Sequence, residues 1–200
     1  MALDLNIPHL SCYALTVEPS TALYKMIAQK KIADVVPEQQ ARQFLQLMNW
    51  LEAAGYEQYE ISNFARPGFR SRHNSSYWRG VSYLGLGPSA HSYNGTGRQW
   101  NVANNTLYIQ ALQRNEPPLE AEMLTKEQQW NEYIMIALRT TEGIDLKRLE
   151  KEFGPAEVEQ LKQQVENYIR NGRMEWKENR LRLTKEGKLF ADGMAGSLFK

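Results

Sequence analysis

The chain has 200 residues, 42% of them hydrophobic, and a formal net charge of +1, which is enough sequence for one large domain or two small ones. The balanced charge identifies no class of partner, and no apolar run approaches the roughly 18 residues of a membrane span. The single cysteine, Cys12, excludes an internal disulfide framework and a multi-cysteine metal or cluster site within one chain. The first residues lack the pattern of a signal peptide, so we expect a cytoplasmic protein.

The first third of the chain follows a strand–helix–strand order. Residues 2–6 resemble the last turn of a helix, so we expect the chain to be the C-terminal part of a longer protein. Residues 10–17 form a predicted strand, and a short helix over 22–31 follows. Residues 41–54 place apolar side chains on one helical face, and residues 56–63 alternate as a second strand. This βαβ order predicts a parallel sheet or barrel, for which two strands alone are too few.

Residues 64–105 are irregular and interrupted by glycines, with a further short strand predicted only over 81–86. Long loops at the ends of parallel strands are the usual place for ligand sites in α/β proteins. The turn Gly85–Ala90 resembles a phosphate cradle only weakly, because Pro88 has no amide donor. Close approach of the backbone at this turn to a ligand or a neighbouring strand is the better interpretation.

The composition changes near residue 105, which predicts two domains, residues 1–105 and residues 106–200. In the second domain, Thr125 and Gln128 form a capping box before an amphipathic helix. Two more helices, a hairpin that turns at residues 178–180 and a closing helix follow. We therefore predict an α/β fold whose second domain is mainly helical and resembles a winged helix.

Winged helices often bind DNA in the major groove. Residues 145–200 carry twelve Lys and Arg against ten Asp and Glu, and the helix that would enter the groove begins with Glu157 and Glu159. Carboxylates placed against phosphates are unfavourable. We expect a domain that packs against protein, with no nucleic-acid partner.

Residues 61–115 contain no aspartate or glutamate, although average composition would give a run of this length about six. The stretch includes Arg66, Arg70, Arg72 and Arg79, together with eight of the 21 aromatic residues. Arginine binds carboxylates and phosphates through a planar fork and stacks on flat rings. The composition predicts a site for a large, flat, anionic ligand, and a basic loop that merely covers a core is the alternative.

The motif His73-Asn74-x-x-Tyr77-Trp78 lies inside this stretch. A histidine can bind a metal through one ring nitrogen while a neighbour holds the other, and Asn74 is a candidate for that neighbour. Tyr77 and Trp78 can supply flat walls. A lone histidine is more often structural than a ligand, so both interpretations stay open at this point.

Five segments of the chain occur in the same order in a known family. They cover residues 9–19, 59–68, 73–78, 83–92 and 138–145. Together they closely resemble the C-terminal half of the oxygen-independent coproporphyrinogen III oxidase-like family of radical SAM proteins, and the resemblance runs over the full chain. The motif over 73–78 is more similar to the HemW branch, proposed haem chaperones, than to the HemN oxidases.

The resemblance implies the last two βα units of a partial (β/α)6 barrel, followed by the family's C-terminal domain. In the family, a Cys-x-x-x-Cys-x-x-Cys loop binds a [4Fe-4S] cluster on which S-adenosylmethionine (SAM) sits. Cys12 cannot replace three cysteines. We therefore do not expect these residues by themselves to hold the cluster or to cleave SAM.

The resemblance also implies roles for single residues. Phe64 and Ala65 would pack against the SAM adenine, and His73 would contact haem, including its iron. The remaining contacts to a tetrapyrrole and to its anionic groups would come from Asn74, Tyr77, Trp78, Arg66, Arg70, Arg72 and Arg79.

These expectations lead to one main functional hypothesis. The chain is expected to belong to a protein of porphyrin or haem metabolism, oxidase or chaperone, with a porphyrinogen or haem as its partner. One alternative is a stand-alone binding or regulatory module that uses the winged-helix-like domain. Another is a folded but inactive segment that associates with a second copy through an open strand edge.

Overall fold

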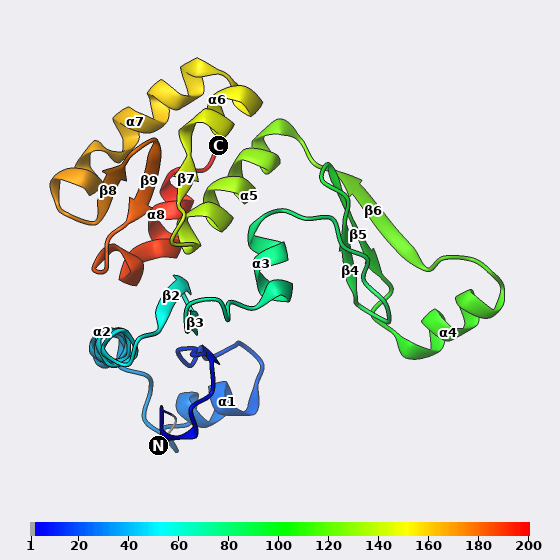
Figure 1. The fold of residues 1–200 in the computed structure, drawn as a ribbon. Helices are drawn as coiled ribbons and strands as arrows, with labels where there is room; N and C mark the ends of the chain where they lie inside the picture. The colour runs from blue at the N-terminus through cyan, green and yellow to red at the C-terminus, as the bar shows by residue number, and fades with distance from the viewer. Residues whose placement is uncertain (1–2) are drawn as a thin grey trace.

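The computed structural model describes residues 3–200, in which helices join three separate three-stranded sheets (Figure 1). The first sheet lies near the N-terminus and the third lies in the C-terminal part. The second sheet forms an arm that projects away from both. The helix that carries His73 lies between the first sheet and the C-terminal part.

The first sheet has the strand order β1-β3-β2, from β1 (His9–Ser11), β2 (Glu57–Glu60) and β3 (Asn63–Ala65). Both outer strands pair with β3 in the antiparallel sense, so the two run in the same direction with a reversed strand between them. The sequence predicted the same-direction pair but not the strand that separates it. The predicted strand over 10–17 is also too long, because regular pairing ends at Ser11.

The predicted strand over 56–63 breaks at Ile61–Ser62 because of the side chain of Glu60. Its Oε2 accepts hydrogen bonds from the backbone N–H of Ser62, at 2.9 Å, and from Nδ2 of Asn63, at 2.5 Å. A side chain that takes up a neighbouring backbone donor competes with the strand ladder. The chain therefore turns after Glu60 and returns as β3.

The helices of the N-terminal part agree with the apolar periodicity of the sequence. They are η1 (Leu3–Leu5), α1 (Ala22–Ala28) and α2 (Pro37–Ala53). Residue 2, which the expected helical turn over 2–6 included, lies outside the described residues. Helix α2 begins with a proline, whose missing N–H costs nothing in a first turn, and Gly55 follows it with a φ of 81°. Met48 and Leu51 of α2 pack with Phe64 of β3 as a small core.

The arm consists of β4 (His91–Tyr93), β5 (Gly97–Asn101), α4 (Asn105–Gln113) and β6 (Leu119–Met123). The expectation of an irregular segment over 64–105 was wrong here, since β4, β5 and β6 pair in antiparallel register. The strand expected over 81–86 is reduced to a single bridge between Tyr83 and Tyr93. This sheet uses residues on both sides of position 105, and a domain boundary there stays a prediction.

The C-terminal part has the helix and strand order of a winged helix, as predicted. Its elements are α5 (Lys126–Arg139), β7 (Ile144–Asp145), α6 (Leu146–Phe153), α7 (Pro155–Arg170), β8 (Met174–Lys177), β9 (Arg180–Leu183), η2 (Gly187–Phe190) and α8 (Ala191–Ser197). The capping box of Thr125 and Gln128 is formed, and the sheet order is β7-β9-β8. The fully buried Ile134, Leu149 and Leu161 belong to one core that α5, α6, α7 and α8 share.

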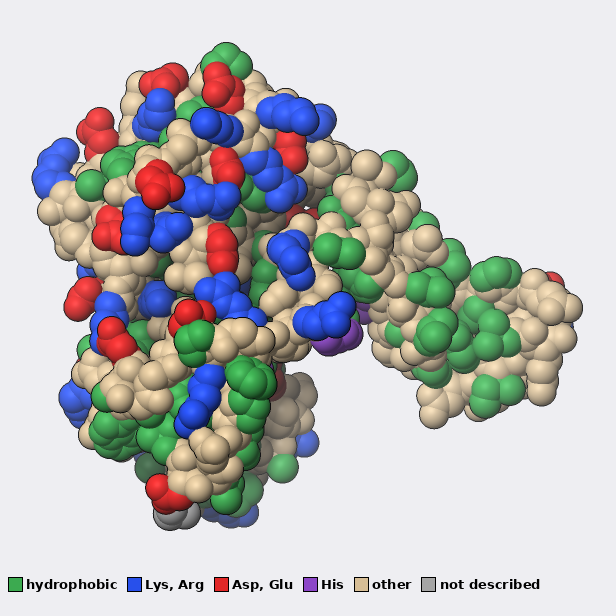
Figure 2. Space-filling view, viewed as in Figure 1, with side chains coloured by type: hydrophobic (Ala, Val, Ile, Leu, Met, Phe, Trp, Pro, Cys, Tyr) green, Lys and Arg blue, Asp and Glu red, His purple; other side chains and the backbone are tan. Residues whose placement is uncertain are grey.

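The surfaces of the two ends differ (Figure 2). Lys, Arg, Asp and Glu side chains intermingle over the C-terminal part, whereas apolar side chains gather on the arm. The exposed apolar residues of the arm and of the segment that leads into β4 include Leu84, Leu86, Leu107, Ile109 and Met123. Among the described helices, none has the length and apolar character that crossing a membrane requires.

Candidate functional site

The motif over 73–78 lies on a short helix, α3 (Arg72–Trp78), where the sequence predicted irregular structure. Ser71 caps it, because its Oγ accepts a hydrogen bond from the N–H of Asn74 at 3.1 Å. With about 3.6 residues per turn, the helix sorts its side chains onto three faces. His73 and Tyr77 share one face, Asn74 and Trp78 a second, and Arg72, Ser75 and Arg79 the third.

An aromatic row begins at the first face. The rings of His73 and Tyr77 meet edge to face, with centroids 5.0 Å apart, and Tyr77 meets Tyr83 in the same way at 4.9 Å. Tyr83 lies 6.2 Å from Tyr93 on β4. His73 itself is exposed. The structure thus places an open imidazole at the end of a row of aromatic rings.

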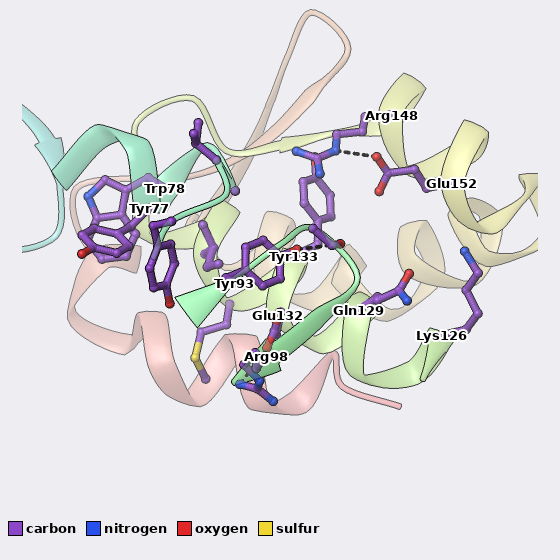
Figure 3. Close-up of a pocket in the computed structure, with 16 residues that line it drawn as sticks. Tyr77, Trp78, Tyr93, Arg98, Lys126, Gln129, Glu132, Tyr133, Arg148 and Glu152 are labelled. Atoms are coloured by element: carbon purple, nitrogen blue, oxygen red, sulfur yellow. Dashed lines mark hydrogen bonds and ion pairs between the residues drawn. The ribbon is translucent and has the colours of Figure 1, made fainter. Parts of the chain in front are cut away.

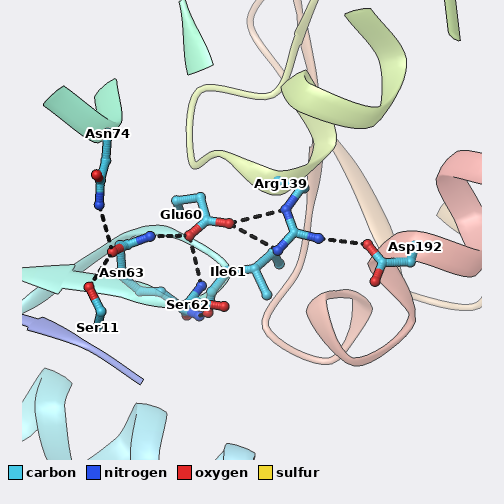
Figure 4. A network of polar contacts seen from close by, with 9 residues as sticks. Ser11, Glu60, Ile61, Ser62, Asn63, Asn74, Arg139 and Asp192 are labelled. Atoms are coloured by element: carbon cyan, nitrogen blue, oxygen red, sulfur yellow. Dashed lines mark hydrogen bonds and ion pairs between the residues drawn. The ribbon is translucent and has the colours of Figure 1, made fainter. Parts of the chain in front are cut away.

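The second face points into the protein (Figure 4). Nδ2 of Asn74 donates to Oδ1 of Asn63, at 3.2 Å, and therefore anchors α3 to β3. The amide of Asn74 was expected to orient the imidazole of His73, and the structure directs it to Asn63 instead. The indole N–H of Trp78 is buried and has no hydrogen-bond partner among the described residues.

The network continues from Asn63 into the C-terminal part (Figure 4). Asn63 Nδ2 donates to Glu60, whose Oε1 accepts from Nε and Nη2 of Arg139 at 3.1 Å each. Arg139 also contacts Asp192 of α8 at 2.7 Å. One chain of polar contacts therefore joins α3, β3, β2, α5 and α8.

The arginines of the acid-free stretch fall into two groups. Arg70 contacts Glu57 at 3.2 Å and Glu142 at 2.7 Å, so two carboxylates from outside the stretch neutralise it. In the described part of the chain, Arg72 and Arg79 form no ion pair, and both are exposed. Nε of Arg79 donates to the carbonyl of Ser75 at 3.1 Å, but neither guanidinium group has a carboxylate partner, so both can bind an anion, whereas that of Arg70 is already paired.

Arg66 was expected to contact an anionic group, but it packs inward. Its guanidinium lies over the ring of Tyr56, 5.4 Å from the centroid, and its Nε is buried without a hydrogen-bond partner among the described residues. Phe64 and Ala65 are 1% and 0% exposed. Their expected contact with the SAM adenine stays a prediction, because their side chains face the core of this chain.

Two cavities adjoin α3. The first, of about 450 Å³ and called here the aromatic cavity, is lined by Tyr77, Trp78, Tyr83, Tyr93 and Tyr133 (Figure 3). Burial raises the pKa of the phenols of Tyr83, Tyr93 and Tyr133. These rings stay neutral at neutral pH and provide apolar walls with hydroxyl groups at their ends.

The second cavity, of about 550 Å³ and called here the cationic cavity, lies between α3 and the C-terminal part. Its wall holds five arginines and only two carboxylates. These residues are Arg70, Arg72, Arg79, Arg148, Arg180, Glu142 and Asp145. The volume of each cavity lies in the range of small-molecule sites.

The [4Fe-4S] cluster that the resemblance implies does not fit these residues. A cluster of this type needs thiolate ligands, and Cys12 is half-buried, with burial raising the pKa of its thiol. Among the described residues, no group of three or more His, Cys, Asp and Glu side chains is placed to hold a metal ion. The arrangement around α3 suits an organic anion instead.

The sequence did not identify the contributions of the C-terminal part to these cavities. Tyr133, Arg148 and Arg180 lie outside the acid-free stretch, and local composition at their positions is ordinary. Glu142 and Asp145 were likewise not assigned to a site. Only the folding of α5, α6 and β9 against α3 brings these residues together with the motif.

Comparison of the chain with known proteins identifies its relatives. The family model described as the HemN C-terminal domain matches residues 124–190. The chain is 33% identical over 197 residues to the heme chaperone HemW of Bacillus subtilis, and 34% identical over 198 residues to HemW of Mycobacterium tuberculosis. These alignments cover 98% of this chain and 52% and 49% of the relatives. The chain thus spans about half the length of the curated relatives that it matches.

The fold agrees with these similarities. The solved structure of the coproporphyrinogen III oxidase HemN from Escherichia coli, described as a radical SAM enzyme, matches with a TM-score of 0.73 at 20% identity. The match covers 100% of this chain and 49% of the HemN chain. It confirms the predicted fold class, in which the end of a radical SAM barrel precedes a winged-helix-like domain.

Proposed function

Because the chain belongs to the HemN/HemW-type family of radical SAM proteins, we propose that it forms the tetrapyrrole-binding part of such a protein. Its ligand is a porphyrinogen or haem, and its role is that of an oxidase or, as the HemW relatives favour, of a haem chaperone. Holding the cluster and cleaving SAM are not assigned to these residues, since Cys12 is their single cysteine. The packing of SAM adenine against Phe64 and Ala65 is part of the same proposal.

The observation that carries the proposal is the exposed imidazole of His73 beside the ring of Tyr77, on a helix that also presents Arg72 and Arg79. A neutral imidazole is the commonest protein ligand of a metal such as haem iron. A neighbouring aromatic ring offers a flat contact for a macrocycle. Arg72 and Arg79, on another face of the same helix and without carboxylate partners among the described residues, match the charge of propionate groups.

The experiment is a haem titration followed by the Soret band. The parent chain is expected to shift the band on binding, and His73→Ala is expected to lose that shift or to weaken binding at least about tenfold. His91→Ala is the matched control, because His91 is also exposed and also contacts an aromatic ring, Trp100, at 6.3 Å. If His73→Ala binds haem as the parent does, the assignment of His73 is wrong.

The alternative, a stand-alone binding or regulatory module that uses the winged-helix-like domain, has a structural difficulty if its partner is a nucleic acid. The exposed face of α7 carries Glu159 and Glu166, which pair with Lys162 and Arg170 of the same helix. These cations are therefore already engaged, and a phosphate backbone would meet the acids. A salt-sensitive shift of DNA on a gel would support the alternative. Association of two copies through the free edges of β1 or β2 also stays a prediction, which light scattering can test.

A further inference from the structure

We propose that the aromatic and cationic cavities form one continuous site for a flat aromatic ring that carries carboxylates, and that the C-terminal part completes this site. The ring lies in the aromatic cavity and the carboxylates lie in the cationic cavity. The inference takes its choice of a porphyrin dicarboxylate from the proposed function. It assigns new binding roles to Tyr133, Arg148 and Arg180, which lie outside the acid-free stretch.

The continuity of the site follows from the residues that both cavities share. Trp78, Tyr133 and Arg148 line the aromatic cavity and the cationic cavity alike. Arg148 lies over the ring of Tyr133, with its guanidinium carbon 4.5 Å from the ring centroid. The two cavities thus adjoin where an aromatic ring and a stacked cation lie together, an arrangement that suits the point at which a flat ring carries its acidic substituent.

The aromatic cavity fits the body of the ligand. Five aromatic rings line it, from α3, the arm and α5, together with the apolar side chains of Met135 and Ile136. Figure 3 shows Tyr77 and Trp78 on one side of this cavity and the residues of α5 and α6 on the other. The α5 and α6 side also carries polar and charged residues, Lys126, Gln129, Glu132, Arg148 and Glu152. Aromatic rings on both sides, Tyr77 and Trp78 facing Tyr133, favour a flat ring between them.

The cationic cavity contains more hydrogen-bond donors than the protein satisfies. Arg72 and Arg79 have no carboxylate partner among the described residues, and neither has the buried indole N–H of Trp78. Arg148 and Arg180 each form an ion pair on one side, with Glu152 at 2.8 Å and with Asp145 at 2.7 Å. A guanidinium group has five N–H donors, so both retain donors for a second acceptor. The two carboxylates of the cavity wall, Glu142 and Asp145, are already paired with Arg70 and Arg180, so a further carboxylate from a ligand would meet the remaining donors.

The two sides of the cationic cavity come from distant parts of the sequence. Arg72 is the first residue of α3 and Arg79 follows its last, whereas Arg148 lies on α6 and Arg180 on β9. A ligand held by both sides bridges the first part of the chain and the winged-helix-like part. The polar network from Asn74 to Arg139 joins these two sides of the chain.

The test compares metal-free protoporphyrin IX with its dimethyl ester, followed by porphyrin fluorescence. The two probes share the ring and differ in the two carboxylates, and neither contains iron that His73 could bind. The parent chain is expected to bind the diacid about tenfold or more tightly than the ester, because charge-assisted hydrogen bonds are the difference between them.

Arg148→Gln and Arg79→Gln are each expected to weaken the binding of the diacid about tenfold and to change the binding of the ester little. The matched control is Arg170→Gln on α7. Arg148 and Arg170 are both exposed helical arginines with a glutamate four residues away, Glu152 and Glu166, so each change removes one surface ion pair. Arg170 lines neither cavity, and its replacement is expected to change nothing.

The outcomes separate this inference from the proposed function. Diacid binding that depends on Arg148 supports the inference, even if haem binding proves independent of His73. If the parent binds the diacid and the ester equally, or if Arg148→Gln and Arg170→Gln bind the diacid alike, the composite site is overturned while the role of His73 can stand. If the parent binds no porphyrin diacid, the inference is wrong.

Discussion

The carboxylate of Glu60 and the guanidinium of Arg139 meet across the junction between the first sheet and the C-terminal part. Oε1 of Glu60 lies 3.1 Å from both Nε and Nη2 of Arg139, and the side chain of Glu60 is 1% exposed. Oε2 accepts two further hydrogen bonds, from Ser62 and Asn63. The buried charge is thus surrounded by donors, which is the condition under which a carboxylate is tolerated inside a protein.

Glu60→Gln is expected to lower the free energy of unfolding by about 3 kcal/mol. The NH2 group of the glutamine would face a donor, either the guanidinium of Arg139 or the N–H groups of Ser62 and Asn63. Arg139 would also lose its buried, negatively charged partner. The measurement is urea unfolding at neutral pH. A loss below about 0.5 kcal/mol would contradict the role assigned to this contact.

Asp192→Asn is the matched control for that change, because Asp192 contacts the same guanidinium, at 2.7 Å, but its side chain is 77% exposed. Solvent screens an exposed pair, so a loss of less than about 1 kcal/mol is expected. Equal losses in the two variants would mean that burial does not distinguish the two contacts.

Asn74→Ala tests the far end of the same network. The change removes the hydrogen bond to Asn63 and is expected to cost about 1 kcal/mol. Because this bond ties α3 to β3, the backbone amides of α3 are expected to exchange with deuterium faster than in the parent. Hydrogen exchange followed by mass spectrometry over residues 71–80 measures this.

The control for Asn74→Ala is Ser76→Ala. Ser76 donates to the carbonyl of Arg72 within α3 and has no link to β3. Its replacement is expected to leave the exchange of α3 almost unchanged. If both variants accelerate exchange equally, the contact with Asn63 does not hold the helix.

The parts of the fold that follow from local patterns were predictable from the sequence. The helical face over 41–54 and the capping box of Thr125 and Gln128 correspond to α2 and α5. The break at Ile61–Ser62 was not predictable, because it depends on the burial of Glu60 against Arg139, which lies 79 residues away. An alternating pattern cannot reveal that one of its polar residues will contact a residue of the C-terminal part.

The candidate site was also predictable only in part from the sequence. Composition alone indicated an arginine-rich, aromatic segment, and the structure places its motif on one helix. Composition could not indicate that Arg70 and Arg98 are neutralised by carboxylates outside the segment, Glu142 and Glu132 among them. Ion pairs between distant positions leave no local signal in a single sequence, so the free and the paired arginines could not be told apart.

Replacement by alanine is expected to destabilise the chain at Gly85 and to stabilise it at Gly193. A Cβ atom at Gly85 would lie 2.1 Å from the backbone oxygen of His91, so the prediction of close backbone approach at this turn is confirmed. Gly85→Ala must displace β4 and is expected to lower the melting temperature by several degrees. At Gly193, inside α8, a Cβ atom meets nothing within 4 Å, and the replacement is expected to stabilise the chain by about 0.5–1 kcal/mol. Calorimetry that finds the same sign for both would contradict these contacts.

Glu132 predicts a pH dependence that originates in the aromatic cavity. Burial raises the pKa of its carboxyl, Arg98 at 2.8 Å lowers it, and Glu122 raises it again. The net shift is upward, so desolvation outweighs the ion pair. The folded chain then binds this proton more tightly than the unfolded chain. The resulting stability is present below the pKa of the unfolded state and is lost as the pH rises through the pKa of the folded state.

Glu132→Gln stays neutral at every pH and leaves Arg98 paired with Glu122 at 3.0 Å. The melting temperature of the variant minus that of the parent is therefore expected to become more positive from about pH 4 to about pH 7. The variant Glu122→Gln lacks one of the groups that raise the pKa of Glu132. When Glu132→Gln is introduced into that variant, the increase of the melting-temperature difference with pH is therefore expected to be smaller. Melting curves in which the difference becomes more negative over this range would show that the ion pair with Arg98, not desolvation, dominates at Glu132.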